Sequence, residues 1–231
     1  MLDLLALPFE IILVNDASPD NTGPVADQVA ASIGEGRIRV IHHPQNLGRG
    51  AAFLSGACEA QGEIVGFLDI DLEVSPVYLV ECIRVIRNED ADLVIGQRHY
   101  KITVGLIHRH ILSTTYSWLM SKVLRIPREF DSESGYKFFK RTTLQRYLNT
   151  FVHNGWFWDT EVVSRFHWDG LNIRSVPCLF LRDESKRSTV RPVRDTLVYC
   201  KNLFAYWQAS RNLVARESVS STAEVTLRNV V

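Results

Sequence analysis

Three carboxylates lie within five residues at the point where an apolar run ends. The stretch EIVGFLDIDLEVSP covers residues 63–76, and its apolar run leads directly into Asp69, which is followed by Asp71 and Glu73. Like charges this close repel one another, so the cluster costs free energy unless a cation lies among them. Carboxylate oxygens suit a hard divalent ion, which typically takes one or two of them together with substrate phosphates. We therefore predict a Mg²⁺ or Mn²⁺ site at these residues; the alternative is a solvated acidic loop.

Alternating strand and helix patterns position this cluster. Such alternation predicts an α/β fold whose mostly parallel sheet is covered by helices on both faces. Ligands bind these sheets beyond the carboxyl ends of the strands, an edge that we call the rim. The turn that contains Asp16 follows the first predicted strand, so Asp16 should share the rim with Asp69 and Asp71. The predicted strands are residues 10–14, 37–43, 63–68 and 91–96, and the predicted helices between them are residues 23–33, 49–61 and 76–88.

The bulk composition is that of an ordinary globular protein. The 231 residues include 46% hydrophobic residues and equal numbers of basic and acidic side chains, 26 of each. This balance indicates no polyanionic partner such as nucleic acid. Four scattered cysteines without metal-ligand spacing predict free thiols in a reducing compartment. With no run of about 18 apolar residues and no signal-peptide pattern, we expect a cytoplasmic protein.

A basic amphipathic segment opens the second half of the chain. Residues 105–126 place apolar side chains at helical spacing, and their polar side carries Arg109, Lys122 and Arg125. Two interpretations stay open: a helix packed on the sheet, or a helix lying on an anionic membrane surface. A further strand is predicted at 173–181. We expect residues 1–214 to form one domain and the polar tail, residues 215–231, to be disordered.

Several motifs in succession resemble those of family-two glycosyltransferases. The motifs are ILVNDASPDNT, NLGRGAAFLSGACEAQGEIVGFLDIDLEVSP, DLVIGQR, DSESGYKFFKR and RDESKRST, and the resemblance covers roughly residues 8–210. They are most similar to dolichyl-phosphate mannosyltransferases and their bacterial polyprenyl-phosphate relatives. The resemblance implies a GT-A fold, the fold of nucleotide-diphospho-sugar transferases. It also implies an inverting, metal-dependent transfer of mannose or glucose from a GDP- or UDP-hexose to polyprenyl or dolichyl phosphate, with peripheral contact at the cytoplasmic membrane face.

The same resemblance implies roles for individual residues. Asp69 and Asp71 fall on its metal-and-donor motif, and Glu73 stands where the mannosyltransferase branch usually has a glutamine ligand. Asn15 replaces an aspartate that is more usual in the family, which leaves the nucleotide preference open. The donor nucleotide is expected at Asp16, Asn46, Gly48, Arg49 and Asp69, and the acceptor phosphate at Arg182, Ser185 and Lys186.

Two further carboxylates are predicted catalytic residues. Asp131 would orient the donor sugar or act as a base, although a helix cap is an equal alternative for it. Glu161 is expected near the sugar, with Trp156 or Trp158 packing beneath it. A lipid phosphate has a second pKa near 6, so it is largely anionic near neutrality and needs a base less than a sugar hydroxyl does.

Two other functions stay open from the sequence. The first is transfer to a sugar hydroxyl in polysaccharide synthesis, which would make Asp131 or Glu161 indispensable. The second is an inactive, truncated fold that binds nucleotide without turnover. In the family a central first strand comes before the helix in which this sequence begins. We therefore expect the strands at 10–14 and 63–68 to be too far apart to hydrogen-bond with each other.

Overall fold

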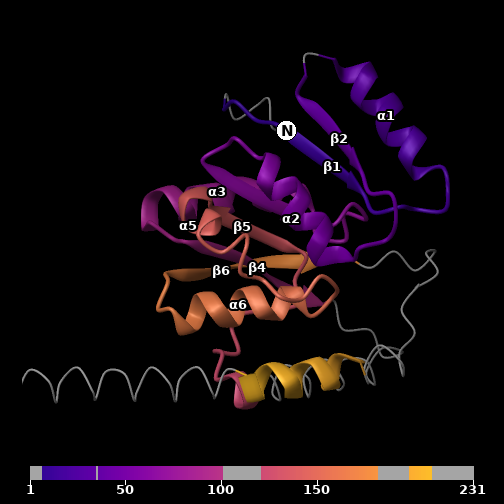
Figure 1. The fold of residues 1–231 in the computed structure, drawn as a ribbon. Helices are drawn as coiled ribbons and strands as arrows, with labels where there is room; N and C mark the ends of the chain where they lie inside the picture. The colour runs from indigo at the N-terminus through magenta and orange to yellow at the C-terminus, as the bar shows by residue number, and fades with distance from the viewer. Residues whose placement is uncertain (1–6, 35, 101–120, 182–197, 210–231) are drawn as a thin grey trace, which may run out of the picture. The chain divides into compact units, whose positions relative to one another are not determined.

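The structure is a computed structural model that describes residues 7–34, 36–100, 121–181 and 198–209 (Figure 1). The chain divides into two compact units, which are Met1–Ser185 and Lys186–Val231. All the labelled strands belong to the first unit, and the described part of the second is a helix at residues 198–209. The predicted acceptor residues Arg182, Ser185 and Lys186 lie outside the described residues, as do most of the basic segment and the predicted tail.

The first unit alternates strands and helices through its first half, as the sequence predicts. Each of the four strands expected before residue 100 forms, and a helix follows each of the first three. The described elements of the first unit, apart from the short helical stretch at residues 121–124, are β1 Ile11–Asn15, α1 Thr22–Ile33, β2 Ile38–His42, α2 Arg49–Glu59, β3 Ile64–Leu68, the 3₁₀ turn η2 Pro76–Tyr78, α3 Leu79–Glu89, β4 Leu93–Tyr100, β5 Tyr136–Lys140, α5 Arg141–Gln145, α6 Trp158–Trp168 and β6 Ile173–Phe180.

The sequence predicts that Asn21 or Thr22 caps the first helix and that Gly34 and Gly62 end the first and second helices; two of these helix ends differ in the structure. The Asn21 side chain makes no capping hydrogen bond to α1; instead Asp20 Oδ1 accepts from the backbone N–H and the hydroxyl of Thr22. Gly62 does not close α2, because the helix ends at Glu59 and Ala60 is already extended. Gly34 does end α1, with a φ of 65° that favours glycine.

The strands form two sheets among the described residues. β1 and β2 make a parallel pair, and the second sheet has the order β3-β5-β4-β6. β5 runs antiparallel to both of its neighbours, whereas β4 and β6 are parallel. The second sheet is therefore mixed rather than mostly parallel, although β3, β4 and β6 still run in one direction. Pro177 lies on β6, the last strand in the described order of this sheet, whose outer side is bridged only at its end, between Phe180 and Val74; a residue without an N–H is tolerated on such an edge.

β1 and β3 belong to different sheets, in agreement with the expectation that they do not pair directly. Within β1, the Ile11 N–H donates to Arg37 O, and Asn15 O accepts from the His43 N–H. Alternate residues face opposite edges of a strand, so the backbone groups of Ile12 and Val14 point away from β2. No described strand pairs with that edge of β1.

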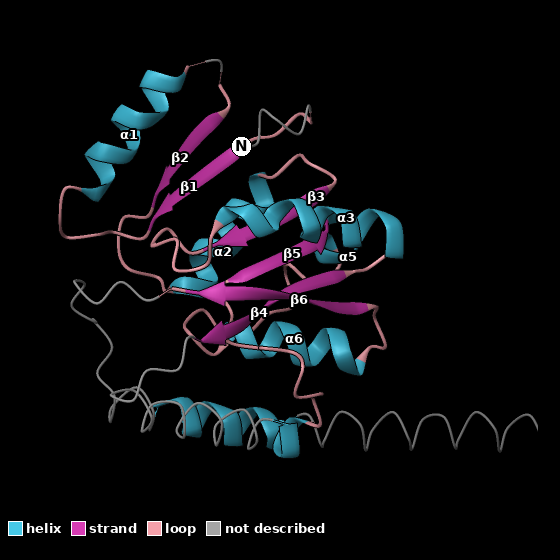
Figure 2. Ribbon diagram, turned by 180° about the vertical axis from the view of Figure 1, so that it is seen from behind, coloured by secondary structure: helices cyan, strands magenta, loops and turns pink. Residues whose placement is uncertain are grey.

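Helices cover both faces of the four-stranded sheet, with α3 and α6 on opposite sides (Figure 2). Tyr136 and Phe138 of β5 belong to the same buried cluster as Cys82 and Val85 of α3. On the other face the Phe139 ring lies 5.9 Å from Phe166 of α6, centroid to centroid. β5 is therefore the core of the unit, buried on both faces.

Candidate active site

Asp16 ties the end of β1 to the loop before α2. Its Oδ1 accepts from the Leu47 N–H at 2.8 Å, and its Oδ2 accepts from the Gly48 N–H at 2.8 Å. The Asn46 amide also donates to the main-chain oxygen of Asp16 at 3.2 Å. The predicted donor residues Asp16, Asn46 and Gly48 are thus brought together at the rim, and the carboxylate of Asp16 is already engaged by protein groups.

His43, for which we predicted no role from the sequence, also contacts Asp16. Its Nδ1 lies 2.7 Å from Asp16 Oδ1, and its Nε2 lies 2.9 Å from the Ser55 hydroxyl on α2. Burial by itself raises the pKa of Asp16. The hydrogen bonds from Leu47, His43 and Gly48 outweigh that effect and lower the pKa below its ordinary value.

Arg49, the first residue of α2, lies at the centre of a charged cluster at the carboxyl end of β3. Its Nη1 donates to Asp69 Oδ1 at 2.5 Å, and its Nε donates to Asp159 Oδ2 at 2.8 Å. The guanidinium lies 4.7 Å from the centre of the Phe67 ring and 5.0 Å from that of Trp156. Burial alone lowers the pKa of Arg49, but the attraction of Asp159 and Asp69 outweighs it and raises the pKa, so the cation is permanent.

Lys137 of β5 contributes a second, fully buried cation. Its side chain is 0% exposed, and its Nζ donates to Asp159 Oδ1 at 2.6 Å and to the Ser134 carbonyl. Burial lowers the pKa of Lys137, and Asp159 opposes this shift. Sequence reasoning missed both Lys137 and Asp159, because their pairing joins residues that are 22 positions apart.

Two glycines allow backbone segments to approach this cluster closely. A Cβ on Gly135 would lie 1.8 Å from Asp69 Oδ2 and 2.3 Å from Arg49 Nη2, so only glycine fits there. Gly48 has a φ of 99°, and a Cβ on it would lie 2.6 Å from the Asn154 carbonyl oxygen. That carbonyl accepts from the N–H groups of Gly50 and Ala51 in the first turn of α2. Gly135 lies within the DSESGYKFFKR motif, whereas no motif contains Asn154.

The acidic turn after β3 is compact. Asp69 O accepts from the Leu72 N–H at 3.2 Å, and Asp71 Oδ1 accepts from the Glu73 N–H at 3.1 Å. Leu72 is in the left-handed region with a φ of 55°. Within the described residues, no three His, Cys, Asp or Glu side chains converge as they would around a metal ion. The carboxylates have the right chemistry for Mg²⁺ or Mn²⁺, but the three predicted ligands are not gathered around one point.

Asp131, a predicted catalytic residue, forms a two-pronged ion pair with Arg98 of β4. Arg98 Nε donates to Asp131 Oδ2 at 2.7 Å, and Nη2 donates to Oδ1 at 2.9 Å. Burial alone lowers the pKa of Arg98, but the hydrogen bonds and charge of Asp131 raise it overall. Both oxygens of Asp131 are therefore engaged by a permanent cation. Arg98 is the last residue of the DLVIGQR motif, but its residue type and position alone predict no role for it.

Glu161, the other predicted catalytic residue, is buried in α6 and 1% exposed. Its oxygens accept from the N–H groups of Val152 and His153, at 3.0 and 2.9 Å, and its Oε2 lies 2.9 Å from the His153 ring. These contacts favour a structural role for Glu161, which is to hold the segment that includes Asn154. Trp158 is 0% exposed and belongs to the core, whereas Trp156 is 60% exposed and lies against Arg49.

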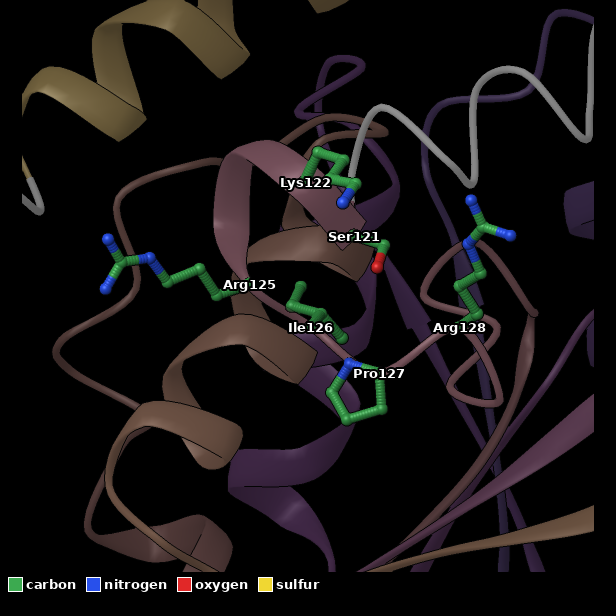
Figure 3. A pocket seen from close by; sticks show the side chains of 6 residues that line it. All are labelled: Ser121, Lys122, Arg125, Ile126, Pro127 and Arg128. Carbon is green, nitrogen blue, oxygen red and sulfur yellow. The ribbon is translucent and has the colours of Figure 1, made fainter.

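A separate basic hollow of about 450 Å³ lies at the end of the basic segment. None of its lining residues belongs to the charged cluster around Arg49. Figure 3 shows that its three cationic side chains point in different directions rather than toward one centre. No described helix is long and apolar enough to span a membrane. The hollow is lined by Ser121, Lys122, Arg125, Ile126, Pro127 and Arg128.

Several known proteins are similar to this chain. Glycosyltransferase AglD of Haloferax volcanii is 30% identical over 202 residues, which are 86% of this chain and 31% of that protein. Polyprenol monophosphomannose synthase of Mycolicibacterium smegmatis is 27% identical over 183 residues, 75% of this chain and 67% of that protein. This chain thus spans about a third of AglD and about two thirds of the synthase.

A solved structure shares the fold. It is glucosyl-3-phosphoglycerate synthase of Mycobacterium tuberculosis in complex with Mn²⁺, UDP and glucosyl-3-phosphoglycerate. The TM-score is 0.61 at 19% identity, and the match covers 87% of this chain and 68% of that one. The fold is therefore that of the GT-A glycosyltransferases. The sequence profile described as glycosyl transferase family 2 matches residues 1–158, more than half of the chain. With the rim of acidic and basic side chains described above, this match establishes that the chain belongs to glycosyl transferase family 2.

Proposed function

We propose that this chain is an inverting glycosyltransferase. It moves mannose or glucose from a GDP- or UDP-hexose to a polyprenyl or dolichyl phosphate at the cytoplasmic face of a membrane. Family membership supports the reaction class. The name of the similar polyprenol monophosphomannose synthase supports the lipid phosphate acceptor.

The donor binds at the rim, where the first turn of α2 meets the end of β3. Asp69 and Asp71 are the residues that would hold Mg²⁺ or Mn²⁺, with Glu73 as the third predicted ligand. Such an ion, when bound, neutralises charge on the diphosphate of the leaving nucleotide. Arg49 contributes a permanent cation beside Asp69, within a hydrogen bond of the metal-binding carboxylate. Asp16, Asn46 and Gly48 shape the adjacent loop around the nucleotide.

The main observation behind this proposal is that both candidate bases, Asp131 and Glu161, already accept hydrogen bonds from other protein groups. Asp131 is paired through both oxygens with Arg98, and Glu161 is 1% exposed and accepts from backbone N–H groups. A sugar hydroxyl must lose a proton as it attacks, so transfer of the donor sugar to a hydroxyl needs a base that is free to accept this proton. A phosphate acceptor needs none near neutrality, because its second pKa is near 6. The geometry therefore favours the phosphate acceptor over the hydroxyl.

The reaction balances without a proton transfer. An oxygen of the acceptor phosphate dianion forms a bond to the anomeric carbon of the sugar. The bond from that carbon to the β-phosphate oxygen breaks, and the electron pair leaves with the nucleoside diphosphate. The product is a phosphodiester with one negative charge. The protein needs cations that keep the two phosphate groups from repelling each other, and Arg182 and Lys186 are proposed for the acceptor.

Contact with the membrane is also part of the proposal. Lys122, Arg125 and Arg128 are three of the six residues that line the basic hollow. Three cations that point in different directions suit an extended anionic surface better than a single phosphate. We therefore propose peripheral association with anionic lipids.

The test is a transfer assay with native protein and two variants. With polyprenyl phosphate as acceptor, we expect the rate to rise as pH passes about 6, where the acceptor loses its second proton. Asp131→Asn keeps one acceptor oxygen for Arg98 and loses the other, because an amide nitrogen cannot accept a hydrogen bond; we expect it to lose about tenfold or less in rate. Asp71→Asn should remove the dependence on Mn²⁺ together with nearly all activity. Loss of more than about a thousandfold in Asp131→Asn, as expected for an essential base, would instead favour a sugar hydroxyl acceptor.

A further inference from the structure

We infer that Asp159 is a positioning residue of the donor site. With Lys137 as its buried counter-ion, it fixes the direction in which the Arg49 guanidinium faces the rim. It thereby sets the affinity for a metal-bound nucleoside diphosphate. This inference rests on the proposed function, because it assumes that the donor binds beside Asp69.

The geometry divides the Asp159 carboxylate between two cations. One oxygen accepts from Arg49 Nε at 2.8 Å, and the other accepts from Lys137 Nζ at 2.6 Å. The three residues come from α6, α2 and β5, so the contact joins three elements of the unit. Because Arg49 is held by Nε, its terminal nitrogens are directed toward the rim, where Nη1 contacts Asp69.

The surroundings leave Arg49 little freedom. Its side chain is 15% exposed, and its guanidinium lies against the Phe67 and Trp156 rings. Asp159 is its inner anchor, and Asp69 is its outer contact at the rim. A ligand phosphate that takes the place of Asp69 breaks only the outer contact. Asp159 then keeps the guanidinium pointing at the ligand, so less side-chain freedom is lost on binding.

Lys137 explains why this anchor is stable. Two carboxylates facing one arginine would leave a net negative charge in a buried place, which is costly. Lys137 balances that charge, so the four groups Arg49, Lys137, Asp69 and Asp159 carry no net charge. A lysine at 0% exposure is itself tolerated only when paired, and Asp159 is its paired carboxylate. The lysine therefore acts on Arg49 through Asp159 and does not touch the ligand.

The test compares a buried and an exposed lysine–aspartate pair that have the same distance between Nζ and Oδ1. The double variant Lys137→Met, Asp159→Asn removes both buried charges at once and leaves no unpaired ion. The matched control is Lys140→Met, Asp90→Asn, in which Lys140 lies on the same strand as Lys137 and Asp90 follows α3; this pair is also 2.6 Å apart, but its side chains are 39% and 84% exposed. Each pair is also changed in an Arg49→Ala background. Calorimetry measures the dissociation constants of UDP and GDP in Mn²⁺, and thermal unfolding monitors the fold.

The expected result is that native protein binds one of the nucleotides. The buried double variant should weaken that affinity about tenfold, and the exposed pair should change it less than about twofold. In the Arg49→Ala background the buried change should have less than about a twofold further effect, since the action of Asp159 passes through Arg49. A merely structural role would weaken binding in both backgrounds, and that result would overturn the inference.

One further variant keeps the test decisive if the double variant does not fold. Arg49→Lys keeps the charge but loses the fork that contacts two carboxylates. It should bind nucleotide as weakly as Arg49→Ala; native affinity in Arg49→Lys would overturn the inference. If the native chain binds neither nucleotide, the proposed function fails and takes this inference with it. If native protein binds and the variants do not change the affinity, the inference alone fails.

Discussion

Gly135 has no side chain, and the side chains of Asp69 and Arg49 occupy the space that a Cβ would need. Because a Cβ there would lie 1.8 Å from Asp69 Oδ2, Gly135→Ala must displace the Asp69 side chain or the backbone of its own turn. We expect Gly135→Ala to weaken Mn²⁺-dependent nucleotide binding about tenfold, measured by calorimetry. Gly62→Ala is the control, since its Cβ would meet only an ordinary contact at 3.4 Å. Equal affinity in the two variants would show that Asp69 is not needed where the structure places it.

Glu161 illustrates a structural role for a residue predicted to be catalytic. Burial by itself raises its pKa, but hydrogen bonds from the side chain and backbone of His153 and from Val152 lower it below the ordinary value. A lowered pKa in the folded state means that the charge stabilises the protein above the ordinary pKa near 4.5. This contribution is lost as pH falls below that value and through the folded pKa.

We therefore expect Glu161→Gln to lower the free energy of unfolding by about 1–3 kcal/mol at pH 7, because it weakens the bonds to Val152 and His153. The difference from native protein should shrink as pH falls below about 4.5. Urea unfolding at a series of pH values measures this. A difference that stays constant with pH would mean that the charge of Glu161 contributes nothing to stability.

At the scale of elements, the sequence predicted the first half well and missed β5 and α6. Each strand before residue 100 is a short apolar run, which is a local signal. β5 contains Lys137, whose charge argues against a buried strand unless Asp159 is known to lie beside it. In α6 eight of the eleven residues are buried, so it lacks the polar stripe that identifies a surface helix. Both elements depend on contacts between residues that are distant in the sequence, and the local sequence pattern does not predict these contacts.

The same distinction applies to the candidate site. Asp16, Arg49, Asp69 and Gly135 lie in motifs, and the structure brings them together around the rim. Arg98, Lys137 and Asp159 act through ion pairs across the fold, so residue types and spacing could not assign their partners. The carboxylates of Asp131 and Glu161 were recognisable as candidates, but whether they are engaged depends on Arg98 and on the backbone near His153.

One edge of β1 has no partner among the described strands, which predicts an alternating pattern of hydrogen exchange along this strand. In β1 the N–H groups of Ile12 and Val14 point away from β2, while that of Leu13 faces it. We expect the amides of Ile12 and Val14 to exchange at least about tenfold faster than that of Leu13. NMR exchange measurements test this. Uniform protection along β1 would show that a further strand occupies this edge in solution.

At the scale of the whole molecule, the chain has equal numbers of basic and acidic residues, so any attraction to a membrane must be local. We expect the native chain to bind vesicles of anionic lipid more tightly than neutral ones, and salt to weaken the binding. Lys122→Glu with Arg128→Glu should reduce binding to anionic vesicles at least about tenfold. Co-sedimentation measures the bound fraction.

The control for this experiment keeps the same change in total charge. Arg87→Glu with Arg146→Glu reverses two exposed cations outside the basic hollow. We expect it to reduce vesicle binding less than about threefold. Equal losses in the two double variants would mean that overall charge, and not the basic hollow, governs the association.

The most direct test of the proposed reaction is a competition between acceptors. Native protein is incubated with Mn²⁺ and with radiolabelled GDP-mannose or UDP-glucose. Polyprenyl phosphate, unphosphorylated polyprenol and an oligosaccharide are present together as acceptors. We expect label only in polyprenyl phosphate, and we expect a chelator to abolish this labelling. Label in the oligosaccharide or in polyprenol, or transfer that persists without a divalent ion, would contradict the proposed reaction.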